Sequence, residues 1–207
     1  MQNVPHNIKE IAKDLPYRDY QLITFLLNNF DLKNNIKDTK WKTVNNICPD
    51  SWIYVQENDV TVGRLYISNN CSPYMVEDEK ILIGMEYFCS EGDNLWNMSD
   101  DEIKEFAQNE LIKIGAIKEN YVIETNRIKV KKAYPAYFDS YKDFNKIKDF
   151  INSIDNLHCI GRNGQHKYNN MDHSVLSGIV AVYIIKNKSD KKDLWNVNNE
   201  KAYHETK

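Results

Sequence analysis

An apolar segment, a polar stretch that starts with glycine and a second apolar segment follow one another between residues 157 and 185. The polar stretch is Gly161–Ser174, and it leads into an apolar helix predicted at Asp172–Ile185. A loop before a helix exposes backbone N–H groups at the positive end of the helix dipole, and Arg162 adds a planar cation. The pattern therefore predicts an anion site. The alternative is that Asp172 only caps the helix while the polar side chains of the loop face water.

Two other phosphate-binding motifs do not fit this stretch. A Walker A loop requires GxxxxGK[ST], and the spacing of Gly161, Gly164 and Lys167 is different. The Gly161–Gly164 segment matches the GxxG of KH RNA-binding modules, but that module has a helix before the loop, where this sequence predicts a strand. The net charge of −3 also provides no basic field, so no nucleic acid partner is expected.

The length of the apolar runs and the cysteine pattern limit the class of protein. The longest nearly apolar run, Val175–Ile185, contains Ser177 and Gly178, and its 11 residues are short of the roughly 20 that a spanning helix needs. Residues 1–13 lack the apolar stretch of a signal peptide. The four cysteines include no Cys-x-x-Cys pair, and the five histidines include no HExxH. We therefore expect a cytoplasmic chain with reduced thiols, no membrane span and no metal site.

The remaining sequence predicts an α+β fold, with most strands before most helices. Residues rich in β-branched and aromatic side chains predict strands at Tyr20–Phe30, Trp52–Gln56, Val60–Ser68, Lys80–Phe88, Tyr121–Val130 and Leu157–Ile160. The first of these segments lacks a clear alternation of apolar and polar residues, so a helix is the alternative there. Apolar residues at helical spacing predict helices at Asn7–Ala12, Ser140–Ile151 and Asp172–Ile185.

Two local signals are sharper than these. Ser99 and Glu102 have the spacing of a capping box, which predicts a helix that continues to Ile114 and ends at Gly115. Asn58-Asp59 predicts a hairpin turn between two strands. The chain contains no repeats and no Gly/Ser/Pro-rich linker, and its Asn- and Lys-rich end predicts a loose tail.

The stretch GRNGQHKYNNMDHSVLSG, residues 161–178, resembles the C-terminal flavin-contacting motif of FAD-dependent oxidoreductases of the amine-oxidase type, and most closely that of the UDP-galactopyranose mutase-like members. There the pattern is Gly-Arg, a few residues, Tyr, an acidic or amide residue, then Met-Asp at a helix start. Ala133–Tyr137 is similar to the Tyr-Pro segment of the mutases, and Thr61–Arg64 to the strand with their phosphate-binding arginine. Asp50–Gln56 and Glu86–Trp96 look like strands of the substrate domain, so the resemblance covers roughly residues 4–187.

The resemblance implies two sets of site residues. The cofactor set, which would contact FAD, is Gly161, Arg162, Asn170, Met171 and Asp172. The substrate set, which would bind the diphosphate of a sugar nucleotide, is Arg64, Tyr134 and Tyr168. One cation and two phenols can bind a diphosphate without neutralising it. The flavin supplies the covalent chemistry in such enzymes, so no catalytic residue is expected in this chain.

The chain also departs from the family pattern. The residues after Arg64 are not the charged ones typical of the mutases, and Asn170 replaces an acid. No GxGxxG occurs, so the first FAD-binding βαβ unit would come from another chain, or is lost. The expected organisation is a substrate-type α+β domain with a mainly antiparallel sheet (1–156), the last strand, loop and helix of an incomplete FAD-binding domain (157–187), and a loose tail (188–207).

These observations predict the C-terminal portion of a FAD-dependent oxidoreductase or mutase that acts on a sugar nucleotide or a similar anionic small molecule. It would be an enzyme only when complemented by an N-terminal FAD-binding half. Two alternatives stay open: a non-catalytic remnant or binding module, and the corresponding half of an amine-oxidase or desaturase-type flavoenzyme. An apolar surface left uncovered by a missing half predicts self-association.

Overall fold

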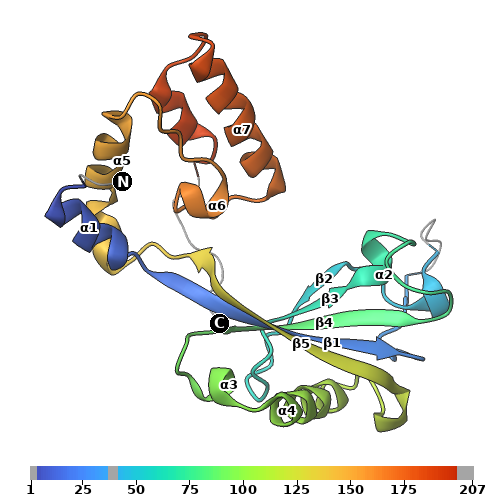
Figure 1. The fold of residues 1–207 in the computed structure, drawn as a ribbon. Coiled ribbons are helices and arrows are strands. Elements are labelled where there is room, and N and C mark those ends of the chain that lie inside the picture. The colour runs from blue at the N-terminus through green and yellow to red at the C-terminus, as the bar shows by residue number, and fades with distance from the viewer. Residues whose placement is uncertain (1–3, 37–41, 200–207) are drawn as a thin grey trace. The chain divides into compact units, whose positions relative to one another are not determined.

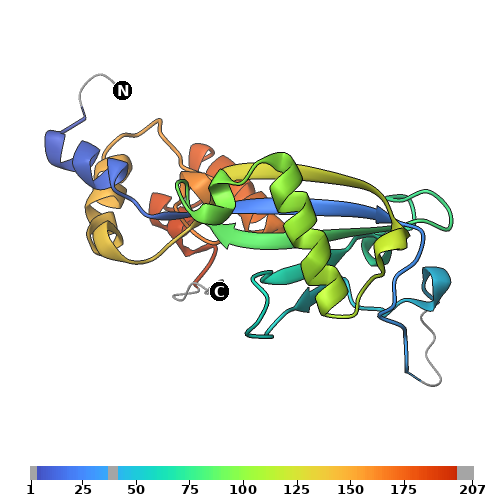
Figure 2. The same cartoon turned by 90° about the horizontal axis from the view of Figure 1, so that it is seen from below.

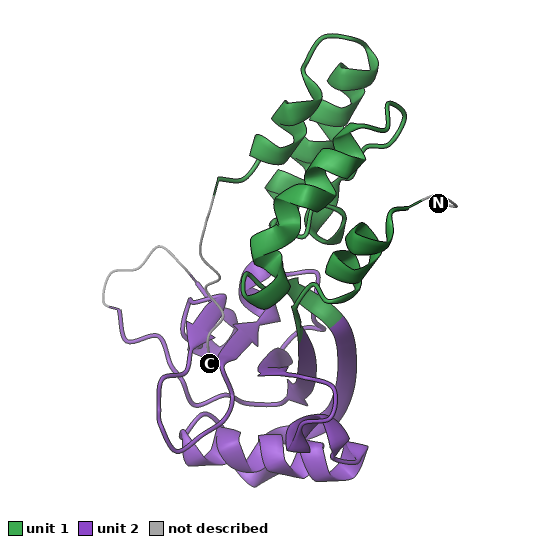
Figure 3. Cartoon of the chain, turned by 90° about the vertical axis from the view of Figure 1, so that its left-hand side faces the viewer, with its two compact units in different colours: residues 1–18, 132–206 green, residues 19–131, 207 purple. Residues whose placement is uncertain are grey.

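A computed structural model describes residues 4–36 and 42–199, and the chain divides into two compact units (Figure 3). Unit 1 combines residues 1–18 with 132–206, and unit 2 contains residues 19–131. The division falls inside two strands rather than near residue 156, where the sequence placed a boundary. The interpretation of each part as a substrate domain or as part of a FAD domain stays a prediction.

Unit 2 is built on a sheet with one long helix (Figure 1). Its strands are β1 (Tyr17–Leu27), β2 (Trp52–Tyr54), β3 (Arg64–Ile67), β4 (Ile81–Cys89) and β5 (Val122–Pro135); β1 and β5 extend into unit 1. Its helices are η1 (Val44–Asn46), α2 (Ser68–Cys71), α3 (Asn94–Asn97), α4 (Asp100–Lys113) and η2 (Glu119–Tyr121).

The five strands form one sheet in the order β2-β3-β4-β1-β5. The pairs β2–β3, β3–β4 and β1–β4 are antiparallel, and the register places Arg64 opposite Glu86. A strand at residues 20–30 is therefore confirmed over helix, although it begins earlier and ends at Leu27. The predicted strand at 60–68 is shorter than expected, because only Arg64–Ile67 pair with their neighbours. The α+β class with an antiparallel sheet is confirmed.

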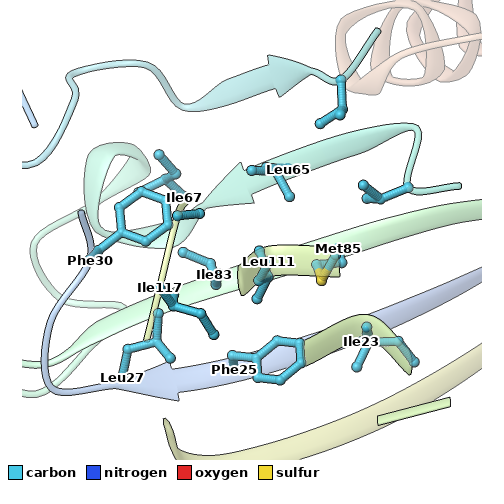
Figure 4. Close-up of a cluster of buried hydrophobic side chains, with 14 of the residues drawn as sticks. Ile23, Phe25, Leu27, Phe30, Leu65, Ile67, Ile83, Met85, Leu111 and Ile117 are labelled. Atoms are coloured by element: carbon cyan, nitrogen blue, oxygen red, sulfur yellow. The ribbon is translucent and has the colours of Figure 1, made fainter. Parts of the chain in front are cut away.

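One face of the sheet carries the core of unit 2. Buried positions alternate along β1, so Ile23, Phe25 and Leu27 point to the same face. Figure 4 shows these side chains together with those of β3 and β4. Helix α4 runs across this face, as Figure 2 shows, and buries Ile103, Ala107 and Leu111 at helical spacing.

The ends of α4 match their sequence signals. The Ser99 hydroxyl accepts a hydrogen bond from the Glu102 backbone N–H at 3.3 Å, and the Glu102 carboxylate accepts one from the Ser99 N–H at 2.8 Å. Gly115 follows the helix with a φ of +72°, a left-handed conformation that glycine adopts without steric cost. The predicted capping box and terminal glycine are confirmed.

Unit 1 is mainly helical. Its elements are α1 (His6–Lys13), η3 (Asp139–Asp143), α5 (Phe144–Asn152), α6 (Gly161–Gly164), α7 (Met171–Ile185) and η4 (Lys191–Asn196). Ile8 of α1 packs with Phe144 and Ile147 of α5 in a small apolar cluster. The helices predicted at 7–12, 140–151 and 172–185 are confirmed, the second with a 3₁₀ turn at its start.

The strand predicted at Leu157–Ile160 is wrong, because this segment forms no ladder. Gly161–Gly164 is a helical turn rather than an open loop. Gly161 has a φ of +74°, and its N–H donates to the Ser177 hydroxyl of α7 at 2.9 Å. The chain therefore bends toward α7 at the position where a strand would have to continue. No last strand of an incomplete FAD-binding domain is present in the described residues.

The segment after α7, where the sequence predicts a loose tail at 188–207, contains the 3₁₀ helix η4. Asp190 and Asp193 form a capping box at the start of η4, and Leu194 is buried. The signal was present in the sequence, since Asp190-x-x-Asp193 precedes Leu194-Trp195. Residues 200–207 of that tail lie outside the described residues. None of the described helices is long and apolar enough to cross a membrane.

Candidate functional site

Arg162 is the second residue of α6 and lies near the start of the polar stretch of unit 1. Its Nε donates to the Asn169 carbonyl at 2.9 Å, and its Nη1 is 3.4 Å from the Ala133 carbonyl. The guanidinium carbon lies 5.3 Å from the ring centre of Tyr134 and 4.7 Å from that of Tyr168. The structure therefore brings together three residues that the sequence predicted as ligands.

The two tyrosines also contact each other. Tyr134 lies at the end of β5 and Tyr168 follows α6, and their rings stack at 5.6 Å with an interplanar angle of 14°. Tyr134 is 8% exposed, so its ring is packed rather than presented on the surface. Two of the three members of the predicted substrate set thus converge around the arginine of the predicted cofactor set.

The charge of Arg162 is not neutralised by a carboxylate of the residues that the structure describes. None of the ion pairs within residues 4–36 and 42–199 includes it, and it contacts carbonyl oxygens and aromatic faces instead. Carbonyl contacts and cation–π contacts orient a guanidinium and leave its full charge. Arg162 can therefore attract an anion.

A chain of buried amides holds the segment that carries Tyr168. The Asn169 side-chain N–H donates to Gln165 Oε1 at 2.7 Å, and Gln165 Nε2 donates to the Leu194 carbonyl of η4 at 2.6 Å. Asn198 Nδ2 donates to the Tyr168 carbonyl at 3.0 Å. These residues were not predicted from the sequence, and only the capping box of η4 could have indicated that the residues around it contribute to this segment.

His166 is enclosed by aromatic rings in the same segment. Its Nε2 lies 3.1 Å from the Ala136 carbonyl, and its ring contacts Tyr17 edge-on at 4.7 Å. Burial lowers the pKa of His166, while the bond to the Ala136 carbonyl acts in the opposite direction. Its Nδ1 has no hydrogen-bond partner in the described part of the chain. The imidazole is therefore neutral at pH 7, and it anchors the segment rather than acting as a charged ligand.

The first turn of α7 carries the other three predicted cofactor contacts. Asn170 is the N-cap residue, so the alternative in which Asp172 caps the helix is wrong. Met171 is 83% exposed, and the exposed Asp172 carboxylate lies 3.2 Å from His173 Nδ1. The N–H groups of a first helical turn have no partners within the helix and carry the positive end of its dipole. This surface can stabilise negative charge on a ligand.

Arg64 begins β3 in unit 2 and has a different environment. Its Nε bonds to the Glu86 carboxylate, and its Nη1 donates to the Tyr54 hydroxyl at 3.2 Å. The guanidinium also lies 4.6 Å from the Trp52 ring centre, and both charged side chains are buried. Arg64 is therefore paired with an acid, unlike Arg162. Its convergence with Tyr134 and Tyr168 stays a prediction.

The segment that leads into Arg64 is held by a buried carboxylate. Glu110 of α4 accepts hydrogen bonds from the backbone N–H groups of Thr61 and Val62, the latter at 3.0 Å, and from the Tyr87 hydroxyl at 2.9 Å. Burial and the neighbouring Glu110 charge raise the pKa of Tyr87, which keeps the phenol protonated as a donor. Glu110 thus positions the Thr61–Arg64 segment, which sequence reasoning did not predict.

Helix α7 also presents an apolar surface. Its exposed residues include Met171, Val175, Leu176, Ile179, Val182, Tyr183 and Ile185, whereas Ser177 and Ala181 are buried. The small and polar side chains therefore face unit 1 and the large apolar ones face outward, which reverses the usual pattern of a surface helix. Exposed stripes of this kind mark interaction surfaces.

Comparisons with known proteins give a fold and no sequence family. No family profile and no curated protein matches the chain. Among solved structures, a crystal structure of reduced UDP-galactopyranose mutase matches with a TM-score of 0.70 at 16% identity, covering 91% of this chain and 38% of the mutase. A protein assigned as a protoporphyrinogen oxidase from Exiguobacterium sp. 255-15 matches with a TM-score of 0.48 at 12% identity, covering 68% of this chain and 28% of the oxidase.

The comparison with the mutase supports the fold that the resemblance implied. At 16% identity the likeness concerns the fold alone, and this chain spans 38% of the mutase's length. The chain therefore has the fold of part of UDP-galactopyranose mutase. The roles of Gly161, Arg162, Asn170, Met171 and Asp172 toward FAD, and of Arg64, Tyr134 and Tyr168 toward a substrate, stay predictions.

Proposed function

We propose that this chain is the C-terminal portion of a FAD-dependent oxidoreductase or mutase that acts on a sugar nucleotide or a similar anionic substrate. The observation that carries the proposal is the cluster of Arg162, Tyr134 and Tyr168. These residues come from two separate stretches of the sequence, each of which resembles a ligand-binding stretch of the same family. The mutase-like fold supports the same assignment.

The residues of unit 1 fit the anionic parts of FAD. Arg162 is a cation without a carboxylate partner among the described residues, and it suits a phosphate oxygen. The N–H groups at the start of α7 suit negative charge on a reduced flavin ring. Bound FAD would supply the redox or covalent chemistry. The chain itself would bind the phosphates of FAD and orient the flavin ring with Asn170, Met171 and Asp172. Gly161 would allow the left-handed backbone turn next to Arg162.

The substrate diphosphate is assigned to Arg64, Tyr134 and Tyr168. The guanidinium would bind a phosphate oxygen, and the phenols would donate neutral hydrogen bonds. Arg64 is already paired with Glu86, so its guanidinium would bind the Glu86 carboxylate and the substrate phosphate at the same time. The guanidinium carbon lies 4.6 Å from the Trp52 ring centre and 5.5 Å from that of Tyr54, and these contacts hold it in place.

The proposal includes a dinucleotide-binding unit supplied by another chain. The sequence contains no GxGxxG, and the exposed apolar stripe of α7 is a surface that such a unit could cover. In its absence the stripe should promote self-association, and FAD should bind weakly because half of the cofactor site is missing. The purified chain is therefore expected to be colourless.

A UDP titration of the purified chain, followed by NMR, tests the substrate assignment. We expect saturable shifts at the amides of Arg162 and Tyr168, and none with uridine, which lacks the diphosphate. Arg64→Lys keeps a positive charge opposite Glu86 but loses the planar, bidentate guanidinium. UDP affinity should therefore fall about tenfold, which corresponds to the loss of one charge-assisted hydrogen bond. Tyr134→Phe should weaken binding only a few-fold.

Arg127→Lys is the matched control, because Arg127 is also an arginine of unit 2 with a nearly buried side chain, and it bonds Gln21 and Asp100. It should leave UDP affinity unchanged. Equal shifts with UDP and uridine, or equal losses in the two arginine variants, would contradict the diphosphate assignment. A yellow preparation with near-stoichiometric flavin would contradict the incomplete cofactor site.

A binding module without catalysis is the second candidate, and the Arg64–Glu86 pair favours it. A buried, paired arginine is costly to disconnect from its carboxylate, so this feature can be purely structural. In that case UDP would still shift the Arg162 segment, while Arg64→Lys would lower stability without a specific loss of UDP affinity. The same titration therefore separates the two candidates.

A further inference from the structure

A small pocket in unit 1 is lined by none of the residues proposed to contact FAD and diphosphate. Its volume is about 50 Å³, and helix α5, the segment after α6 and the chain end around η4 form its walls. Tyr141, Phe144 and Trp195 provide aromatic surfaces, and the Phe144 and Trp195 rings meet edge-on at 6.1 Å. The pocket is therefore bounded by packed rings and by the segment around η4.

Lys148 places a positive charge at this pocket. Its Nζ lies 5.7 Å from the ring centre of Phe144 and 5.7 Å from that of Trp195. No ion pair or hydrogen bond within residues 4–36 and 42–199 includes Lys148. Lys146 on the same helix instead bonds Asp143 at 2.8 Å. Lys148 is thus held over two aromatic faces without a counter-ion among the described residues.

The remaining lining strengthens the positive potential. Lys167 is a second cation at the pocket, and the buried amides of Gln165 and Asn198 complete the polar part of its wall. None of its lining residues among those that the structure describes is acidic. The carboxylates of Asp190 and Asp193 are engaged in the capping box of η4. Two ammonium groups beside low-dielectric ring surfaces attract an anion more strongly than they would in water.

We propose that this pocket binds a single phosphate group between Lys148 and Lys167. Its volume suits one tetrahedral oxyanion. A phosphate monoester carries about −1.5 to −2 charges at pH 7, which the Lys148 ammonium, unpaired among the described residues, attracts. Lysine acts as a mobile point charge for such a ligand, and the Tyr141 phenol, whose pKa burial raises, is protonated and able to donate.

The indole N–H of Trp195 gives a direct measurement, because this ring lines the pocket and its Nε1 bonds Asn152 at 3.0 Å. Its ¹⁵N NMR signal is assigned with Trp195→Phe. Inorganic phosphate and glycerol phosphate are titrated separately at constant ionic strength set with chloride. We expect saturable shifts, and the tighter of the two ligands shows whether the group is free or carried by a larger molecule.

Lys148→Met removes the charge and keeps the apolar stem over both rings, so it should weaken phosphate binding at least tenfold. Lys167→Met should also weaken it, and Lys146→Met is the matched control that should not. A linear shift without saturation, or the same affinity in the Lys148 and Lys146 variants, overturns the proposal. The pocket contains none of the residues assigned to FAD or UDP, so its failure leaves the proposed function unaffected.

Discussion

The two units are stabilised in different ways. Unit 2 buries a continuous apolar cluster between its sheet and α4, and the buried charged groups of Arg64, Glu86 and Glu110 have hydrogen-bond partners. Unit 1 buries a small cluster around Ile8 and fixes its polar stretch by amide and backbone hydrogen bonds. The large apolar side chains of α7 stay outside. The segment with the proposed chemistry is therefore held by directional hydrogen bonds, whereas the sheet is held by apolar packing.

The largest loss of stability is expected for a substitution in the core of unit 2. Phe25→Ala should lower the free energy of unfolding by about 3–5 kcal/mol, because it removes a fully buried ring and leaves a cavity. Urea denaturation followed by circular dichroism measures the loss. The control Ile123→Thr, at a half-exposed position of β5, should change the free energy by less than about 0.5 kcal/mol. Equal effects would show that the core is not where the sheet's stability resides.

The buried carboxylate of unit 2 gives the next largest effect. Glu110→Gln replaces one acceptor oxygen by an NH₂ group that faces backbone N–H donors, so we expect a loss of about 1–3 kcal/mol. Glu105→Gln on the exposed side of α4 is the matched control and should be neutral. A neutral Glu110→Gln would mean that the carboxylate does not hold the Thr61–Arg64 segment.

Two glycines of unit 1 should respond with opposite signs. Gly161→Ala places a Cβ in a left-handed conformation and should cost about 1–2 kcal/mol. Gly178→Ala lies inside α7, where an added Cβ meets nothing within 4 Å, and should stabilise by about 0.5–1 kcal/mol. Thermal denaturation compares the two. A stabilising Gly161→Ala would remove the backbone explanation for that glycine.

The smallest effect concerns pH and His166. Burial lowers its folded pKa, so the unfolded chain binds a proton first as the pH falls below about 6.5. The stability contribution of the neutral imidazole is fully present above pH 6.5 and is lost below it. The loss between pH 6.5 and 5.5 should stay under about 1.4 kcal/mol, the limit for one proton. Urea denaturation at both pH values should show a smaller loss in His166→Gln, and His6→Gln, at an exposed position, should behave like the wild type.

The sequence predicted unit 2 better than unit 1. Apolar and β-branched residues at strand spacing, together with the Ser99–Glu102 capping box, are local signals that the structure follows. Leu157–Ile160 carries the same β-branched signal, but a strand also needs a partner ladder, which a residue pattern does not contain. The segment instead leads into a turn that Gly161 permits and Ser177 holds.

The sequence predicted the proposed ligand-binding residues of the candidate site but not the residues that hold them in place. Arg162, Tyr134 and Tyr168 come together as the motif resemblance indicated. The hydrogen bonds of the Gln165 and Asn198 side chains were not predicted. They join residues about 30 positions apart and leave no periodic pattern in the sequence. The Glu86 partner of Arg64 follows from strand register, which becomes visible only once β3 and β4 are aligned.

A crystal structure of the protein with UDP tests the central claim most directly. The account predicts that the diphosphate contacts Arg64, Tyr134 and Tyr168, with the three polar tips within about 10 Å of one another, as hydrogen bonds of about 3 Å require. If Arg64 instead lies on the opposite side of the sheet from Tyr168, or UDP is bound elsewhere, the sugar-nucleotide assignment is contradicted and only the likeness to the flavoenzyme fold stands.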